Sequence, residues 1–176
     1  MNEAVYIGLG SNLGDKERNL RESLRRMRPF ARVRVVSSLY RTEPVGFIEQ
    51  DWFLNAAACI QTALEPAALL DALLAVEQTM GRVRGVRNGP RLIDLDLLFW
   101  GNQILDLPGL CVPHPRISER QFVLLPLAEI AEELVHPKLQ MSVAAMSRAL
   151  GAPLGVARWY SDQWPPHATI PAMPVA

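Results

Sequence analysis

Two aspartates interrupt an apolar segment near the middle of the chain, and this segment constrains the fold more than any other. Residues 92–99, LIDLDLLF, have the leucine, isoleucine and phenylalanine content of a strand, so successive side chains point to opposite faces. Asp94 and Asp96 therefore share one face. Because an unpaired buried carboxylate is costly, this face must meet a cation.

A block of arginines precedes the aspartates. Residues 80–91 contain Arg82, Arg84, Arg87 and Arg91 and no acidic residue. These arginines could neutralise the aspartates in a structural ion network. The more specific hypothesis is a hard divalent cation on the two carboxylates, because oxygen ligands with space left for phosphate and water suit magnesium. The arginines would then bind the remaining phosphate charge.

The composition limits the class of protein. The 176 residues are 49% hydrophobic and 20% charged with zero formal net charge, which predicts an ordinary globular domain without general affinity for nucleic acid. No apolar run is long enough to span a membrane, and the N-terminus lacks the pattern of a signal peptide. We expect a monomeric, cytoplasmic protein that binds neither membrane nor nucleic acid. Cys59 and Cys111 lack ligand spacing and are expected to be small buried side chains in a reducing compartment.

Strand and helix patterns alternate through the first part of the chain. One helix is capped by Asp15 and stopped by Pro29, and a second begins at Pro66 and ends at Gly81. The predicted strands cover residues 4–9, 32–40, 53–62 and 92–99. This β-α-β-β-α-β order predicts the ferredoxin-like fold of the α+β class, an antiparallel sheet with both helices on one face.

The topology predicts where the aspartates point. If Ile93, Leu95, Leu97 and Phe99 pack under the helices, the two carboxylates stand on the opposite, open face, and the functional site lies there. Glycines near the first strand, GLGSNLG, suggest a dinucleotide-binding fingerprint, but the third glycine comes one position too late.

The C-terminal part contributes loops and short helices. A loop at residues 108–120, PGLCVPHPRISER, holds His114 between two prolines, as either an incidental or a functional residue. An apolar segment at 121–127 is followed by predicted helices at 128–134 and 142–150. These complete a domain of residues 1–150. The proline-rich residues 151–176 are expected to be an irregular tail, although Trp159 and Trp164 indicate that part of it docks.

Seven segments within residues 4–137 match one family in order. They are YIGLGSNLGD (6–15), SSLYRTEPVG (37–46), FLNA (53–56), E-x3-GRVR (77–84), RNGPRLIDLDLL (87–98), VPHPR (112–116) and RQFVLLPL (120–127). The chain thereby resembles the 6-hydroxymethyl-7,8-dihydropterin pyrophosphokinases of folate biosynthesis. The resemblance implies transfer of pyrophosphate from ATP to the pterin hydroxymethyl oxygen, release of AMP, two magnesium ions and a ferredoxin-like core.

The resemblance also implies a role for individual residues. Asp94 and Asp96 match the metal-bridging aspartates, and Arg82 and Arg91 match catalytic arginines that hold phosphates. Residues that match ATP contacts are Glu77, Arg84, Arg87, His114 and Arg120. Residues that match the pterin pocket are Thr42, Pro44, Val45, Gly46, Phe53, Asn55 and Phe122. From the residues alone, an exposed strand position is the favoured interpretation of Asn55, and the resemblance reverses it.

Some positions depart from the family pattern. Asn88 stands where many relatives have tryptophan, and Leu92 stands where threonine is usual. Gly109 and Cys111 replace polar residues. These departures are expected to affect ATP affinity rather than the chemistry.

Two other functions share the predicted fold. A single-stranded RNA-binding module would use the open sheet face, but two carboxylates there would repel a phosphodiester chain. A regulatory ligand-binding domain has no need for the paired carboxylates.

Overall fold

In the computed structural model, which describes residues 3–44, 49–82 and 89–165, strands and helices alternate as the sequence predicts. The strands are β1 (Val5–Ser11), β2 (Ala31–Val36), β3 (Leu39–Thr42), β4 (Phe53–Thr62), β5 (Asp94–Trp100), β6 (Leu105–Leu107), β7 (Leu110–Val112), β8 (Val135–His136), β9 (Met141–Ser142) and β10 (Val156–Trp159). The helices are α1 (Lys16–Met27), α2 (Pro66–Thr79), the 3-10 helix η1 (Ile117–Glu119), α3 (Gln121–Ala131) and α4 (Val143–Ala149).

The central sheet has the ferredoxin-like order, which confirms the predicted fold class. Its strands run β10-β3-β4-β1-β5, and β2 also pairs with β4. All of these pairs are antiparallel. The predicted strand at residues 32–40 is divided into β2 and β3, because the Ser37 hydroxyl accepts the Ala57 N–H at 2.9 Å where the chain bends between them.

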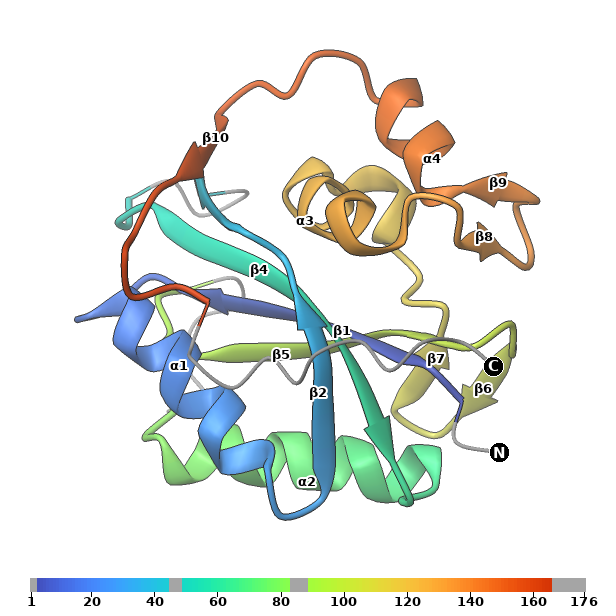
Figure 1. The fold of residues 1–176 in the computed structure, drawn as a ribbon, viewed down its shortest axis with the longest axis horizontal. Coiled ribbons are helices and arrows are strands. Elements are labelled where there is room, and N and C mark those ends of the chain that lie inside the picture. Colours follow the sequence, from blue (N-terminus) through green and yellow to red (C-terminus); the bar gives the residue numbers. More distant parts are fainter. Residues whose placement is uncertain (1–2, 45–48, 83–88, 166–176) are drawn as a thin grey trace.

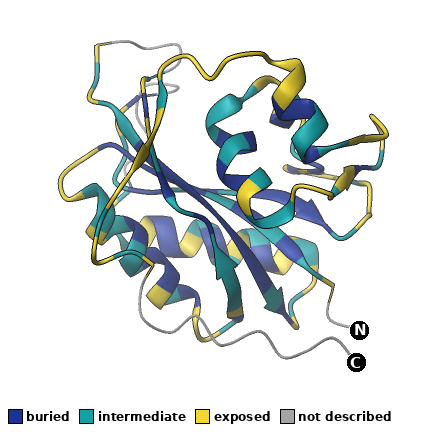
Figure 2. Ribbon diagram, turned by 45° about the horizontal axis from the view of Figure 1, so that its top comes forward, coloured by how far each residue is buried: buried dark blue, intermediate teal, exposed yellow. Residues whose placement is uncertain are grey.

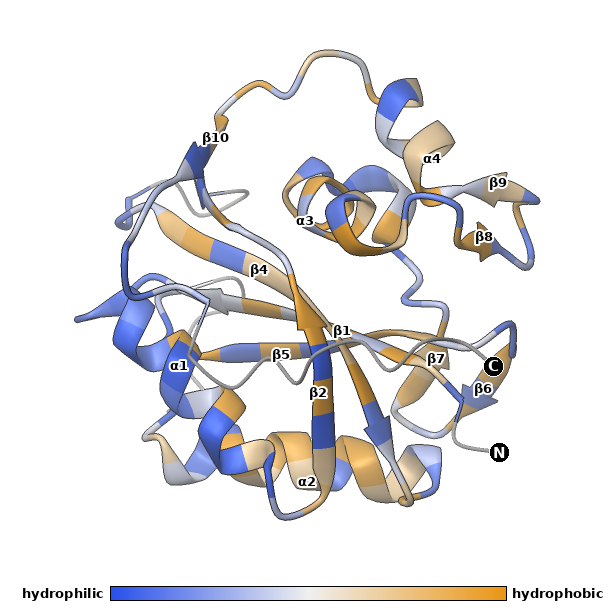
Figure 3. Ribbon diagram, in the orientation of Figure 1, coloured by the Kyte–Doolittle hydropathy of each residue, from blue (hydrophilic) through white to orange (hydrophobic). Residues whose placement is uncertain are grey.

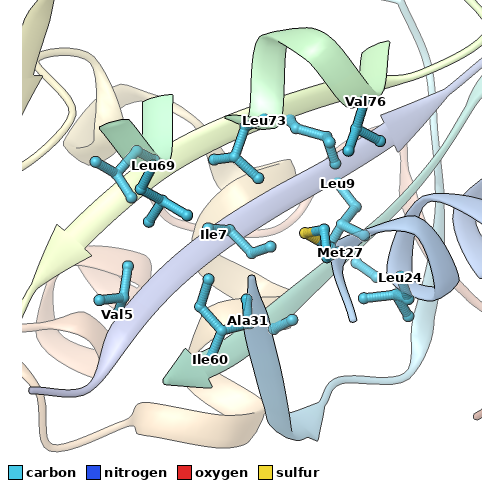
Figure 4. Close-up of a cluster of buried hydrophobic side chains, with 14 of the residues drawn as sticks. Val5, Ile7, Leu9, Leu24, Met27, Ala31, Ile60, Leu69, Leu73 and Val76 are labelled. Atoms are coloured by element: carbon cyan, nitrogen blue, oxygen red, sulfur yellow. The ribbon is translucent and has the colours of Figure 1, made fainter. Parts of the chain in front are cut away.

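Helices α1 and α2 cover one face of the sheet (Figure 1). Asp15 caps α1 by accepting the Arg18 N–H at 3.0 Å, and Pro66 occupies the first turn of α2. The apolar stripes of both helices meet β1 in the first core cluster, where Met27, Leu73 and Ile7 lie close together (Figure 4). The two helices and their apolar faces are therefore as predicted.

The opposite face is only partly open, so the prediction that it is uncovered is wrong. α3 packs against β4 and β3, and α4 packs against α3 (Figure 1). A second core cluster lies beneath them, formed by Ala57, Leu98, Phe99, Ile117, Val123, Leu124, Leu127, Val143 and Met146. The predicted apolar segment at 121–127 and most of the predicted helix at 128–134 form one helix, α3. It contains Pro126 and buries Val123, Leu124, Pro126 and Leu127.

A register shift in β5 changes the face of Phe99. Ile7 pairs with Leu97 but Tyr6 pairs with Phe99, so Leu98 is an additional residue in the strand. Phe99 therefore joins the second core cluster, whereas the sequence predicted it beneath α1 and α2. The shift lies after Asp96, so both aspartates keep their common face.

The tail is not irregular throughout. Residues 156–159 form β10 at the edge of the sheet, and Trp164 packs against the first core cluster. The prediction of an irregular tail is wrong for this segment, because backbone pairing with β3 does not depend on an apolar pattern. Figure 2 shows the buried central strands and the more exposed outer surfaces of the helices. None of the helices in the described ranges is both long and apolar enough to cross a membrane.

Candidate functional site

The aspartates of β5 stand opposite glycines of β1. Asp94 pairs with Gly10 and Asp96 with Gly8, and hydrophilic positions interrupt the hydrophobic strand β5 (Figure 3). Because glycine has no side chain, no Cβ occupies the space beside either aspartate on this face. A Cβ on Gly10 would lie 2.8 Å from Asn55 Oδ1, closer than carbon and oxygen can approach. Sequence reasoning missed this role; alternate glycines in a strand beside the aspartates were the available signal.

Asp94 is bound by two arginines. Arg82 Nη1 lies 2.7 Å from Asp94 Oδ1, and Arg91 Nη1 lies 2.9 Å from Asp94 Oδ2. All three side chains are between 20% and 26% exposed, so solvent screens these ion pairs only in part. The structure thus brings together three of the four residues predicted as catalytic.

Glu77 holds this arrangement from below. Its Oε1 accepts the Leu95 N–H at 2.7 Å and lies 2.5 Å from Arg82 Nη1. Burial raises the pKa of Glu77, while the Leu95 N–H and Arg82 oppose that rise. In this structure Glu77 contacts Arg82 and β5 beneath the cavity, and it is not among the cavity-lining residues.

Asp96 occupies a less compensated position. Its nearest cation is Arg120, whose Nη1 lies 3.6 Å from Asp96 Oδ2. Although 34% of the side chain is exposed, partial burial of the carboxylate and then the negative charge of Asp94 raise the pKa of Asp96 to about 7. Arg120 offsets these two effects only in part, and a further cation here would lower the pKa of Asp96.

Asn12 connects Arg91 to the chain near Phe53. Its Oδ1 accepts the Arg91 N–H at 2.8 Å, and its Nδ2 donates to the carbonyl of Asp51 at 3.1 Å. Asn12 is 1% exposed, and sequence reasoning did not identify it. Among the described residues, Arg91 Nε is the buried side-chain donor without a hydrogen-bond partner. Such a donor suits an anionic oxygen.

The predicted pterin residues line the same cavity, where the Arg91 guanidinium carbon lies 5.6 Å from the Phe53 ring centroid. Asn55 is 8% exposed and its Nδ2 donates to Thr42 Oγ1 at 2.6 Å, so it is not an exposed strand residue. Pro44, Phe53 and Phe122 also line the cavity. Val45 and Gly46 lie outside the described residues.

One cavity of about 460 Å³ is lined by both groups of residues. Its lining includes Asp94, Asp96, Arg91 and Arg120 from one group and Thr42, Phe53, Asn55 and Phe122 from the other. A volume of this size accommodates a small organic ligand beside charged groups. It also includes Leu154, Gly155 and Val156, which sequence reasoning did not assign to a site.

His114 lies beside Arg120 and Arg116. Its Nδ1 accepts the Arg116 N–H at 3.2 Å, so its neutral form carries the proton on Nε2. Burial first, and then the charges of Arg120 and Arg116, lower the pKa of His114 to about 4. Arg84, Arg87 and Asn88 lie outside the described residues.

The donor set for a metal consists of the two aspartates. The described residues contain no cluster of three or more histidine, cysteine, aspartate or glutamate side chains in a metal-binding arrangement. Two carboxylates leave most positions of a hard cation for substrate oxygens and water, which fits magnesium rather than a protein-enclosed ion. Both cysteines are free, and Cys59 is buried as predicted. The prediction that Cys111 is buried is wrong, because it is the outward-facing middle residue of the short strand β7.

Comparison with known proteins gives a single family. The model of the 7,8-dihydro-6-hydroxymethylpterin-pyrophosphokinase (HPPK) family matches residues 6–132. The 2-amino-4-hydroxy-6-hydroxymethyldihydropteridine pyrophosphokinase of Methylorubrum extorquens is 50% identical over 134 residues, which are 74% of this chain and 84% of that protein. The protein of the same name from Bacillus subtilis is 47% identical over 136 residues, with 76% and 81% covered.

Longer relatives contain a similar segment. The chain spans 20% of the folic acid synthesis protein fol1 of Pneumocystis carinii, with 43% identity over 145 residues. Among solved structures, wild-type HPPK-DHPS of Plasmodium falciparum with pterin and p-hydroxybenzoate superposes with a TM-score of 0.70 at 15% identity, over 92% of this chain and 47% of that chain. At this identity the likeness shows the fold alone.

Proposed function

The chain belongs to the 7,8-dihydro-6-hydroxymethylpterin-pyrophosphokinase family of folate synthesis, and we propose that it transfers the terminal pyrophosphate of ATP to 6-hydroxymethyl-7,8-dihydropterin. The hydroxymethyl oxygen forms a bond to the β-phosphorus, the bond from that phosphorus to the α,β-bridging oxygen breaks, AMP leaves, and the hydroxyl proton passes to solvent.

A single observation carries this proposal. One cavity is lined both by a group of carboxylates and arginines and by a buried amide with two aromatic side chains, and Arg91 and Arg120 lie 5.6 and 5.8 Å from the ring centroids of Phe53 and Phe122. The charged group suits phosphates and a hard cation, whereas an amide with donors and an acceptor suits the polar edge of a pterin ring. The carboxylates also oppose the alternative of a single-stranded RNA-binding module.

Asp94 and Asp96 would hold the two magnesium ions. The fit rests on their shared face and on the weaker pairing of Asp96, whose contact with Arg120 is 3.6 Å, whereas Asp94 is bound by two arginines at 2.7 and 2.9 Å. When bound, magnesium would neutralise the phosphates and acidify the pterin hydroxyl.

The arginines orient and neutralise the phosphates. Arg82 and Arg91 are proposed as the catalytic pair, since the unpaired Nε of Arg91 offers a donor for a phosphate oxygen. Arg120 and His114 are proposed to contact the nucleotide, with Arg84 and Arg87 contributing further charge. Glu77 is proposed to act on the ATP side by holding Arg82.

The remaining residues recognise the pterin. Asn55 would read its donor-acceptor edge, with Thr42 fixing the orientation of the amide. Phe53 and Phe122 would pack against the ring faces, and Pro44, Val45 and Gly46 would complete the pocket.

We further propose that the protein acts as a monomer in the cytoplasm, where ATP is available, and that it binds neither nucleic acid nor membrane. Sedimentation of the purified protein tests the oligomeric state.

AMP formation tests the reaction. We expect AMP and pterin diphosphate to appear only when ATP, magnesium and the dihydropterin are all supplied. Arg82→Ala and Arg91→Ala should each reduce kcat by roughly a hundredfold, as removal of a preorganised donor to a transition-state charge does. AMP release that does not depend on the dihydropterin would refute the proposal.

A further inference from the structure

Residues 154–164 include β10, which lies at the edge of the sheet (Figure 1), and Leu154, Gly155 and Val156 line the cavity. In β10, Val156 pairs with Thr42 and Trp159 pairs with Leu39. The segment just before Val156 continues this contact, because the Glu43 N–H donates to the carbonyl of Gly155 at 2.9 Å. The tail is thus an additional strand on the side of the cavity where the pterin residues lie.

The pairing leads directly to Asn55. In the sheet, β3 lies between β10 and β4, so Val156, Thr42 and Asn55 belong to three adjacent strands. Thr42 pairs with Val156 on one side, and its hydroxyl accepts the Asn55 amide at 2.6 Å on the other. The backbone of Thr42, and with it the orientation of Asn55, is therefore fixed from the β10 side.

A second connection leads to Phe53. The Trp159 ring packs on the Trp52 ring, with centroids 5.2 Å apart and planes at 34°. Lys16 Nζ lies 3.8 Å from the Trp52 ring centroid, and the same ammonium pairs with Asp51 at 2.6 Å. Trp52 immediately precedes Phe53 and is thus held between α1 and the tail.

The end of the segment is anchored on the other side of the sheet. Trp164 Nε1 donates to the carbonyl of Ser37 at 2.8 Å, and the ring packs against the first core cluster. Ser161 donates to Glu17 Oε1 at 2.8 Å, and Arg21 binds Gln163. These anchors hold β10 in place although most of the segment is exposed.

We propose that residues 154–164 are a positioning element for pterin recognition, acting through Thr42 on Asn55 and through Trp52 on Phe53. This inference rests on the proposed function. Within the described residues, no hydrogen bond or ion pair joins the segment to Arg82, Arg91, Asp94 or Asp96. Arg82 is held by Glu77 on α2, whereas Asn12 joins the backbone of Arg91 to the carbonyl of Asp51. Loss of the segment should therefore affect the two substrates unequally.

Calorimetry on the full-length protein separates the two effects. One titration measures α,β-methylene-ATP with magnesium, and a second measures the dihydropterin against protein saturated with that nucleotide. For Trp159→Ala we expect the Kd of the pterin to rise about three- to tenfold, as for loss of an aromatic pair, with the Kd of the nucleotide within about twofold of wild type. Trp159→Phe, which keeps an aromatic ring, should restore most of the affinity.

Tyr160→Ala is the matched control, because this neighbouring side chain is 82% exposed. It should leave both dissociation constants unchanged. A chain ending at Gly151, which lacks β10 altogether, should lose more pterin affinity than Trp159→Ala.

Three results would overturn the inference. The first is an unchanged pterin Kd in both Trp159→Ala and the shortened chain. The second is equal weakening of both ligands with a lower unfolding temperature, which would make the segment a general stabiliser. The third, wild-type protein that binds nucleotide but no pterin, would overturn the proposed function as well and is recognised before any variant is made.

Discussion

The buried carboxylate of Glu77 on α2 lies 2.5 Å from Arg82 Nη1, while Arg82 also contacts Asp94. The same carboxylate accepts the Leu95 N–H of β5. One side chain thereby ties the helix, the aspartate strand and the proposed catalytic arginine together. We propose that Glu77 positions this arginine and does not contact the phosphates itself.

Replacing Glu77 tests this connection. Glu77→Gln keeps an acceptor for the Leu95 N–H but removes the charge that holds Arg82. Since hydrogen bonds to charged groups contribute about 1.5–3 kcal/mol, we expect kcat to fall by roughly tenfold or more in steady-state kinetics. Glu65→Gln, at the exposed start of α2, should behave as wild type. Normal turnover in Glu77→Gln would show that Arg82 is positioned by other contacts.

The two aspartates should respond differently to neutralisation, although both variants should be inactive. Asp94→Asn leaves Arg82 and Arg91 without their anion, so the free energy of unfolding without magnesium should fall by about 1–3 kcal/mol. The measurement is urea denaturation at pH 8. An Asp94→Asn variant that keeps near-normal activity would exclude the proposed metal role.

Asp96→Asn should have the opposite effect on stability. Because the folded state raises the pKa of Asp96 to about 7, the native protein binds more protons than the unfolded chain between pH 4 and 7, and its stability falls as pH rises through that window. The variant should therefore be more stable than wild type at pH 8, by roughly 1–2 kcal/mol after solvent screening, and should lose this advantage near pH 4. Equal stability at pH 8 would contradict the assigned shift.

His114 predicts an acid-sensitive contribution. Its pKa falls to about 4 in the folded protein, so between pH 4 and its ordinary value near 6.5 the unfolded chain binds more protons. The free energy of unfolding should thus decrease as pH falls through this window. His114→Asn keeps an acceptor near the Arg116 N–H but does not titrate. The stability of wild type relative to this variant should fall by about 2 kcal/mol between pH 7 and 4.5. Parallel curves would contradict this prediction, and the contribution of Asp96 cancels in the comparison.

Gly10 should be sensitive to the smallest side chain. In Gly10→Ala the new methyl group would meet Asn55 Oδ1 at 2.8 Å and displace the amide from Thr42. We expect the Kd of the pterin to rise about tenfold, because a buried polar group loses its partner. Gly8→Ala is the comparison for folding, since its methyl group would make ordinary contacts at 3.6 Å or more. Unchanged pterin affinity in Gly10→Ala would contradict the proposed role of Asn55 in pterin recognition.

Spacing along the chain determined the core elements. The stripe of Leu20, Leu24 and Met27 and the alternation in residues 53–62 follow the periods of helix and strand, which are set by local backbone geometry. The shared face of Asp94 and Asp96 followed in the same way. The family was predicted from the resemblance in seven segments, and the family match confirms it, whereas the roles of the two aspartates stay a prediction.

Tertiary structure decided what depends on residues distant in sequence. The additional residue Leu98 turned Phe99 to the other face, and α3 covered part of the sheet that the topology left open. Asn12 reached Arg91 across 79 positions, and β10 found its partner in β3. Sequence alone determined the elements because hydrophobic periodicity is local. Only the fold decided which residues Glu77 contacts, how closely Asn55 approaches Gly10 and where β10 pairs, because each depends on the position of another element.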